Sequence, residues 1–295
     1  MPLPEADAHL AAQRRLSAAT LAAVEREWAT VGEDFERGWL RVGPRMVALV
    51  TTGQLGAARD GIAYVPTALA AQSIDVAALA RIEASAFAGI SYSLDGMRAG
   101  SLDALLYGAV VHARSGGESL GERLVRGRTF LRTVVPGQVA DANRMATGVA
   151  VTARPGVGYT RLATAPCCQR CAVLAGRFYR VASFQRHPRD DCRMVPTNEA
   201  NHQDAGYTIG PDDVTDLTPP QRQAIADGAD MTRVINAHRT YGTAGDYRSA
   251  RTSDGMLTTA FGSHPVLTPE AIYRVTATRE DALALLRKNG YLSAL

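Results

Sequence analysis

The chain has 295 residues, of which 46% are hydrophobic and 21% are charged, a balance that excludes disorder over its whole length. No stretch approaches the ~18 to 20 uninterrupted apolar residues that a bilayer-spanning helix needs. The N-terminal residues also lack the basic start and apolar core of a signal peptide. We therefore expect no membrane association, with synthesis and folding in the cytoplasm.

The net charge of +3 is spread unevenly along the chain. Residues 122–193 contain 13 arginines and four acidic residues, a net charge of +9, whereas the rest of the chain carries −6. This spread fits an anionic partner for the basic segment, and it fits a solvated arginine-rich surface equally well.

Apolar periodicity predicts that the first 150 residues are mostly helical. Between residues 21 and 49, apolar side chains recur at steps of three or four, on one stripe of a helix or of two successive helices. The stripe consists of Leu21, Val24, Trp28, Val31, Phe35, Trp39, Val42, Met46 and Leu49. Gly32 and the pair Gly43-Pro44 interrupt it, so we expect a break near one of them. The stripe fits a partner-binding seam, but packing on the domain's own core is the commoner arrangement.

Further helices are predicted in chain order. An apolar face predicts a helix over Ser101–Arg114. Ser119 opens the next one, with Glu122 completing a capping box, and this helix runs toward Pro136. Residues 139–149 look helical again. Before residue 150, no alternation of apolar and polar residues is long enough to predict a sheet.

A turn-rich junction at residues 154–158 marks a domain boundary. Two short strands are predicted after it, at Tyr159–Ala163 and Arg177–Val181. C-terminal to these strands, Thr218 and Gln221 cap a predicted helix that runs to about Asp227, and a further helix is predicted over about 230–237. Residues 239–267 are predicted to form a loop or extended arm. Two last helices begin at Thr268 and Thr278, and Asn289-Gly290 ends the second.

These elements predict an α+β fold that is predominantly α-helical. We expect a helical N-terminal domain over 1–150, a small domain with short strands and a Cys/His site over 151–240, and an extended arm with C-terminal helices over 241–295.

A metal site is the main chemical hypothesis. Cys168 and Cys171 are separated by two residues, a spacing that lets both thiolates reach one ion at ~2.3 Å, and His187 and Cys192 can supply the other two ligands. Four such ligands predict a closed structural zinc site. A disulfide formed in an oxidising medium and reduced cysteines that merely pack are alternatives. Other ligand sets are open too: Cys167 in place of Cys168, or Asp190, Asp191 or His202 in place of His187 or Cys192.

Catalytic motifs are lacking. The sequence has no HExxH, GxSxG, P-loop or GxGxxG motif, and its six histidines are dispersed. We expect His112 and His238 to be packed or partly exposed helix residues. The chain is accordingly expected not to be an enzyme.

The cysteine segment belongs to a longer pattern that resembles the signature of the MuF-like minor head proteins of tailed bacteriophages, closest to the versions of actinobacterial phages. The pattern consists of Gln138–Ala142, Arg154-Pro155, Pro166–Arg180, Phe184–Pro188, Asp191–Arg193, Asp227–Asp230, Val234–Ala237 and Leu267–Tyr273. Two positions depart from it. Asp190 stands where the family commonly has a further cysteine, and Cys167 is an extra thiol.

The resemblance implies that residues 151–240 form a MuF-like domain and that the chain is a structural minor capsid protein. Such proteins are virion components at the portal vertex or in the head interior, and some are thought to assist head assembly or DNA ejection. The expected partners are the portal protein and the major capsid protein, with packaged DNA facing segment 122–193. Proteins of this kind are sometimes labelled capsid maturation proteases, which is the first alternative. A nucleic-acid-binding module with a zinc knuckle-like site is the second.

Overall fold

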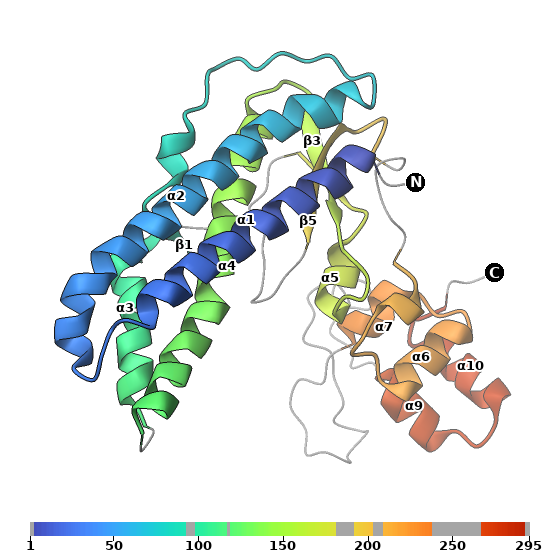
Figure 1. Cartoon of the computed structure of the whole chain (residues 1–295). Coiled ribbons are helices and arrows are strands. Elements are labelled where there is room, and N and C mark those ends of the chain that lie inside the picture. The colour runs from blue at the N-terminus through green and yellow to red at the C-terminus, as the bar shows by residue number, and fades with distance from the viewer. Residues whose placement is uncertain are drawn as a thin grey trace. The chain divides into compact units, whose positions relative to one another are not determined.

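The computed structural model describes residues 3–92, 98–116, 119–180, 192–202, 209–237 and 267–292 (Figure 1). The chain divides into two compact units, each made of two separate stretches. Unit 1 comprises Met1–Leu162 and Gly176–Tyr207, and unit 2 comprises Ala163–Ala175 and Thr208–Leu295. These units differ from the three consecutive ranges expected from the sequence, and most of the expected arm lies outside the described residues.

The described part of unit 1 contains four α-helices: α1 (Pro4–Trp28), α2 (Phe35–Ala70), α3 (Leu102–Arg114) and α4 (Leu120–Thr152). The three long helices α1, α2 and α4 run side by side (Figure 1). A break between α1 and α2 was expected at one of two glycines, and it occurs at Gly32. Its φ of +85° is a left-handed conformation that glycine adopts without strain. Asp34 then caps α2 by accepting a hydrogen bond from the backbone N–H of Arg37 at 3.0 Å.

Prolines do not end the long helices. Pro44 lies inside α2, and Pro136 lies inside α4, so the two helices expected around Pro136 are one continuous helix. A proline removes one backbone hydrogen bond and clashes with the preceding turn, at a cost of ~3 kcal/mol. Two fully buried residues lie within three positions of each proline, and their packing offsets the cost. They are Val42 and Met46 beside Pro44, and Val135 and Val139 beside Pro136.

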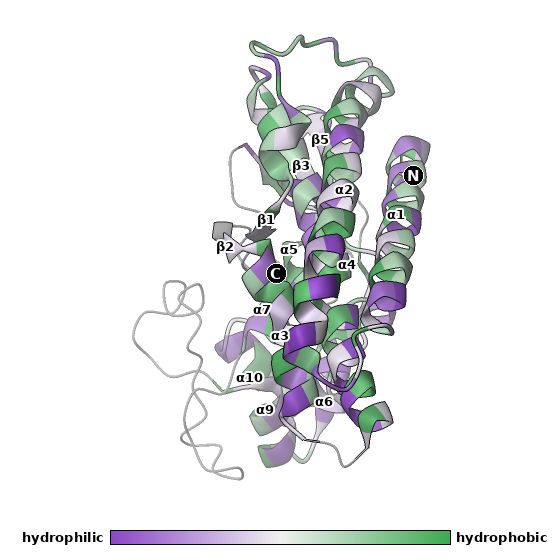
Figure 2. Cartoon of the chain, turned by 60° about the vertical axis from the view of Figure 1, so that its left-hand side comes forward, coloured by the Kyte–Doolittle hydropathy of each residue, from purple (hydrophilic) through white to green (hydrophobic). Residues whose placement is uncertain are grey.

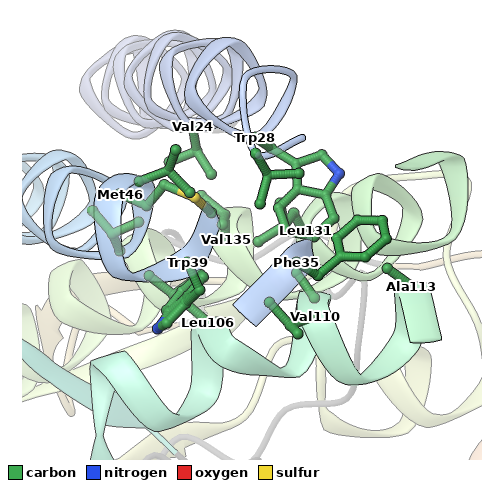
Figure 3. Packing of buried hydrophobic residues seen from close by; sticks show 14 of the residues in the cluster. Val24, Trp28, Phe35, Trp39, Met46, Leu106, Val110, Ala113, Leu131 and Val135 are labelled. Atoms are coloured by element: carbon green, nitrogen blue, oxygen red, sulfur yellow. The ribbon is translucent and has the colours of Figure 1, made fainter. Parts of the chain in front are cut away.

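The predicted stripe of α1 and α2 faces the core of unit 1. Figure 3 shows its side chains pointing toward those of α3 and α4. The figure labels Val24, Trp28, Phe35, Trp39 and Met46 of the stripe, together with Leu106, Val110 and Ala113 of α3 and Leu131 and Val135 of α4. All are buried, and full burial of a large apolar side chain contributes about 1.5–3 kcal/mol. The expectation that the stripe packs on its own domain is therefore confirmed.

Short strands complete unit 1. The described strands β4 (Phe178–Tyr179), β3 (Val157–Leu162) and β5 (Arg193–Asn198) form an antiparallel sheet in that order. Both predicted strands are confirmed, although β3 begins two residues earlier and ends one residue earlier than expected, and β4 is limited to two residues. The strand β5 was not predicted. The expectation of no sheet before residue 150 is wrong, because β1 (Ile90–Tyr92) pairs with β2 (Arg98–Ser101).

Unit 2 is a small helical unit. Its described α-helices are α5 (Gln169–Leu174), α6 (Pro219–Ala226), α7 (Met231–Asn236), α9 (Pro269–Val275) and α10 (Arg279–Lys288). The predicted caps are confirmed: Thr218, Thr268 and Thr278 each accept a hydrogen bond from the first turn of their helix. The last two helices share one apolar core with α6 and α7, formed by Ala224, Ala229, Val234, Ala237, Ile272, Ala282, Leu286 and Tyr291.

The described chain is thus predominantly helical with a few short strands, as the sequence predicts. Figure 2 shows hydrophilic residues along every long helix. Within the described ranges, we find no helix with the length and apolar character required to cross a bilayer.

Candidate functional site

Cys168 and Cys171 lie at the start of α5 in unit 2. Cys168 is the N-cap of this helix, in an extended conformation with φ −82° and ψ 163°, and Cys171 lies in the first turn. Residues three apart share one face of a helix, so the two-residue gap places both thiols on the same side of α5. Cys171 is buried and Cys168 is partly exposed. The two-residue spacing of this half of the predicted ligand set is compatible with a tetrahedral ion.

The chain before α5 is held by the segment that precedes α6. The backbone N–H of Cys167 donates to the carbonyl of Asp213 at 2.8 Å, and its own carbonyl accepts from Thr215 at 2.9 Å. The backbone N–H of Gln169 donates to the Asp216 carboxylate at 2.7 Å. The two neighbours of Cys168 are therefore both bonded to residues 46 to 48 positions further along the chain, which fixes Cys168 on both sides.

Of the other two predicted ligands, the structure describes only Cys192. Cys192 is part of unit 1, where it is buried directly before β5, and its carbonyl accepts a hydrogen bond from Arg144 Nη2 at 3.3 Å. Arg144 in turn pairs with the buried carboxylate of Asp141 at 3.1 Å. His187, Asp190 and Asp191 lie outside the described residues.

No disulfide bond joins the four cysteines, all of which the structure describes. Among the described residues, we find no group of three or more His, Cys, Asp or Glu side chains that could hold a metal ion. His187 lies outside that search, so the zinc set of Cys168, Cys171, His187 and Cys192 stays a prediction. Its thiol and imidazole donors suit Zn²⁺ chemically.

The dispersed histidines of the described chain have structural contacts. His112 is an exposed residue of α3 that stacks on Phe130 with ring centroids 4.6 Å apart, in line with the expected packed or partly exposed helix residue. His202, an alternative ligand, contacts the carbonyl of Glu199 through Nδ1 at 2.7 Å. His238 lies outside the described residues.

Acidic residues outside the basic segment 122–193 neutralise part of its charge. Arg132 pairs with Glu25 and Arg180 pairs with Glu199. Arg193 Nη2 is 2.6 Å from Asp7 Oδ1. The charge that the folded segment presents is therefore smaller than its sequence count of +9 indicates.

A polar cluster on the N-terminal half of α1 was missed at the sequence level. His9 Nδ1 lies 2.9 Å from Asp60 Oδ2 of α2, and His9 Nε2 lies 3.2 Å from Asn143 Oδ1 of α4. The imidazole ring stacks on Tyr64 with centroids 3.9 Å apart and an interplanar angle of 4°. No local spacing signals this cluster, because His9 and Asn143 are 134 positions apart.

No protein family model matches the chain significantly, and neither does any curated protein or solved structure.

Proposed function

We propose that the chain is a structural minor head protein of a tailed bacteriophage, of the MuF-like kind. In this proposal it docks at the portal vertex or on the inner surface of the head. Its partners are the portal protein and the major capsid protein, and packaged DNA is a third contact, made by exposed arginines of segment 122–193. The single observation that supports the proposal best is how the resembling segments pack.

In unit 2, segments of the pattern that are far apart in sequence contact one another. The Tyr273 hydroxyl donates to Asp227 Oδ2 at 2.7 Å, which joins two segments 46 positions apart. Ala229, Val234, Ala237 and Ile272 come from three segments and lie in one core. A composite pattern whose members pack together is what a shared scaffold requires.

The same holds in unit 1 for the first segment of the pattern. Gln138, Asp141 and Ala142 are buried in α4. The Gln138 side chain accepts from the backbone N–H of Tyr92 at 2.7 Å and donates to its carbonyl at 2.9 Å, which holds the β1 strand. Arg144 connects Asp141 to Cys192, a residue of a later segment of the pattern. Several of the resembling residues thus have framework roles, which supports a structural function.

Co-expression with the candidate partners tests the proposal. The chain should co-elute in size-exclusion chromatography with the portal protein or with the major capsid protein encoded by the same phage, and the eluted partner should stay full-length. Co-elution with neither protein would count against docking. Specific cleavage of the capsid protein would favour the maturation protease instead, and DNA binding that falls steeply with salt would favour the nucleic-acid module.

A further inference from the structure

His9 lies between two hydrogen-bond acceptors. One is the Asp60 carboxylate, and the other is the side-chain oxygen of Asn143. The orientation of the Asn143 amide follows from its second contact, because its Nδ2 donates to the buried carbonyl of Ala57 at 2.9 Å. A flipped amide would place an oxygen against that carbonyl oxygen. Asn143 Oδ1 therefore faces the imidazole ring.

Two acceptors on one imidazole require two ring protons. A neutral imidazole has one N–H and one lone pair, so it would direct that lone pair at an oxygen atom on one side. The imidazolium ion donates on both sides. The His9 side chain is only 8% exposed, which leaves water little access to compensate for a lost hydrogen bond.

The surroundings supply the negative partner. Asp60 and Tyr64 face the ring from α2, and Asn143 faces it from α4. Burial raises the pKa of Asp60, but hydrogen bonds from His9 and Gln13 outweigh this and hold that pKa below its ordinary value. Burial raises the pKa of Tyr64 well above its ordinary value, so its stacked ring stays neutral.

Other charged groups lie beyond the ring, near the Tyr64 hydroxyl. They are Glu5 and Asp7 of α1 and Arg193 of β5. Arg193 is engaged with α1, since it donates to Asp7 and, at 3.2 Å, to the carbonyl of Ala6. Asp60 is thus the anion that contacts the imidazole directly.

We propose that His9 is a proton-dependent clamp that holds the N-terminal half of α1 against α2 and α4. The clamp is complete when the ring carries two protons, and it loses one of its two connections when the ring carries one. Loss of one ring proton removes a donor from one of the two contacts, so the clamp should weaken as the pH rises. This proposal does not depend on the proposed function.

The C-terminal half of α1 is held by different means. Val24 and Trp28 are fully buried in the core of unit 1, and neither side chain titrates. Loss of the clamp should loosen only the N-terminal half of α1. The C-terminal half of the same helix therefore serves as the internal control.

Hydrogen–deuterium exchange of the full chain at pH 5.5 and pH 9.0, corrected for intrinsic exchange rates, tests the clamp. Protection of residues 4–16 should fall by roughly three- to tenfold at pH 9.0, the range for a partly screened hydrogen bond, whereas residues 20–28 keep theirs. His9→Gln should abolish the difference. His112→Gln, at an exposed ring stacked on Phe130, should leave it intact. Equal protection of residues 4–16 at both pH values in the unsubstituted chain would overturn the proposal.

A second variant covers the case in which His9→Gln fails to fold. Asp60→Asn keeps the titrating ring and removes its anionic partner, so the pH dependence of residues 4–16 should shrink. An undiminished pH dependence in Asp60→Asn would show that the ion pair is not its source.

Discussion

The indole N–H of Trp28 in α1 donates to the carbonyl of Leu124 in α4 at 2.9 Å, across 96 positions of sequence. The ring fits there because position 127 has no side chain. A Cβ added to Gly127 would lie 2.1 Å from Trp28 Cζ2 and 2.8 Å from the carbonyl oxygen of Ala109. The contact between α1 and α4 therefore requires tryptophan, the largest residue type, at position 28 and glycine, the smallest, at position 127.

Gly127→Ala should lower the free energy of unfolding by about 1–3 kcal/mol, the usual effect of overpacking a rigid core. Urea denaturation followed by tryptophan fluorescence measures the change. Gly121→Ala is the matched control in the same helix, because its nearest neighbour there is the Ser119 hydroxyl at 3.9 Å. That control should be neutral or stabilising by up to ~1 kcal/mol, as expected of alanine in an exposed helix. Equal behaviour of the two variants would contradict the packing described.

Unit 2 should lose stability in acid through Asp227. Burial raises the pKa of this carboxyl, but hydrogen bonds from Tyr273, Arg279 and Gln223 lower it below its ordinary value. A lowered pKa in the folded state stabilises the fold above the ordinary carboxyl pKa, and this contribution disappears as the pH falls.

Asp227→Asn should therefore destabilise the chain by roughly 1–2 kcal/mol at pH 7, with allowance for the exposed Arg279 partner, and the deficit should narrow between pH 5 and pH 3. Urea midpoints by circular dichroism measure both. Asp212→Asn serves as the control, since that carboxylate is fully exposed and 3.9 Å from its nearest arginine. A pH-independent deficit for Asp227→Asn would contradict the linkage.

The zinc hypothesis predicts about one equivalent of zinc in the purified chain, by elemental analysis. Cys168→Ser and Cys171→Ser should each lose the metal. Cys167→Ser should retain it, because Cys167 is not part of the pair with the two-residue spacing, Cys168 and Cys171. Less than about a tenth of an equivalent in the unsubstituted chain would remove the hypothesis. Loss of zinc in Cys167→Ser alone would transfer the role from Cys168 to Cys167.

The structural features that could be predicted from the sequence are those set by residues close together in the chain. The capping boxes at Ser119 and Thr218 were predicted because each involves residues only three positions apart. The stripe of α1 and α2 was predicted from its period. The interruption expected at Pro136 is absent from α4, because the burial that stabilises the helix there comes from contacts with other helices.

Features that depend on distant partners were missed. The β1 strand is held by the Gln138 side chain, 46 positions away, and three residues are too few for a visible alternation. The His9 cluster likewise exists only once three helices have packed. In the candidate zinc site, the pairing of Cys168 with Cys171 could be predicted from their spacing in the sequence. The assignment of Cys192 to the other unit depends on the path of the whole chain, which no local spacing reveals.

Mass spectrometry of gradient-purified phage particles tests the proposed function most directly. If the chain is a structural head protein, its peptides should be present in mature, DNA-filled heads at a few copies per particle, in the same ratio to the portal protein in every preparation. Particles that carry portal and capsid proteins but no trace of this chain would contradict a structural role in the virion.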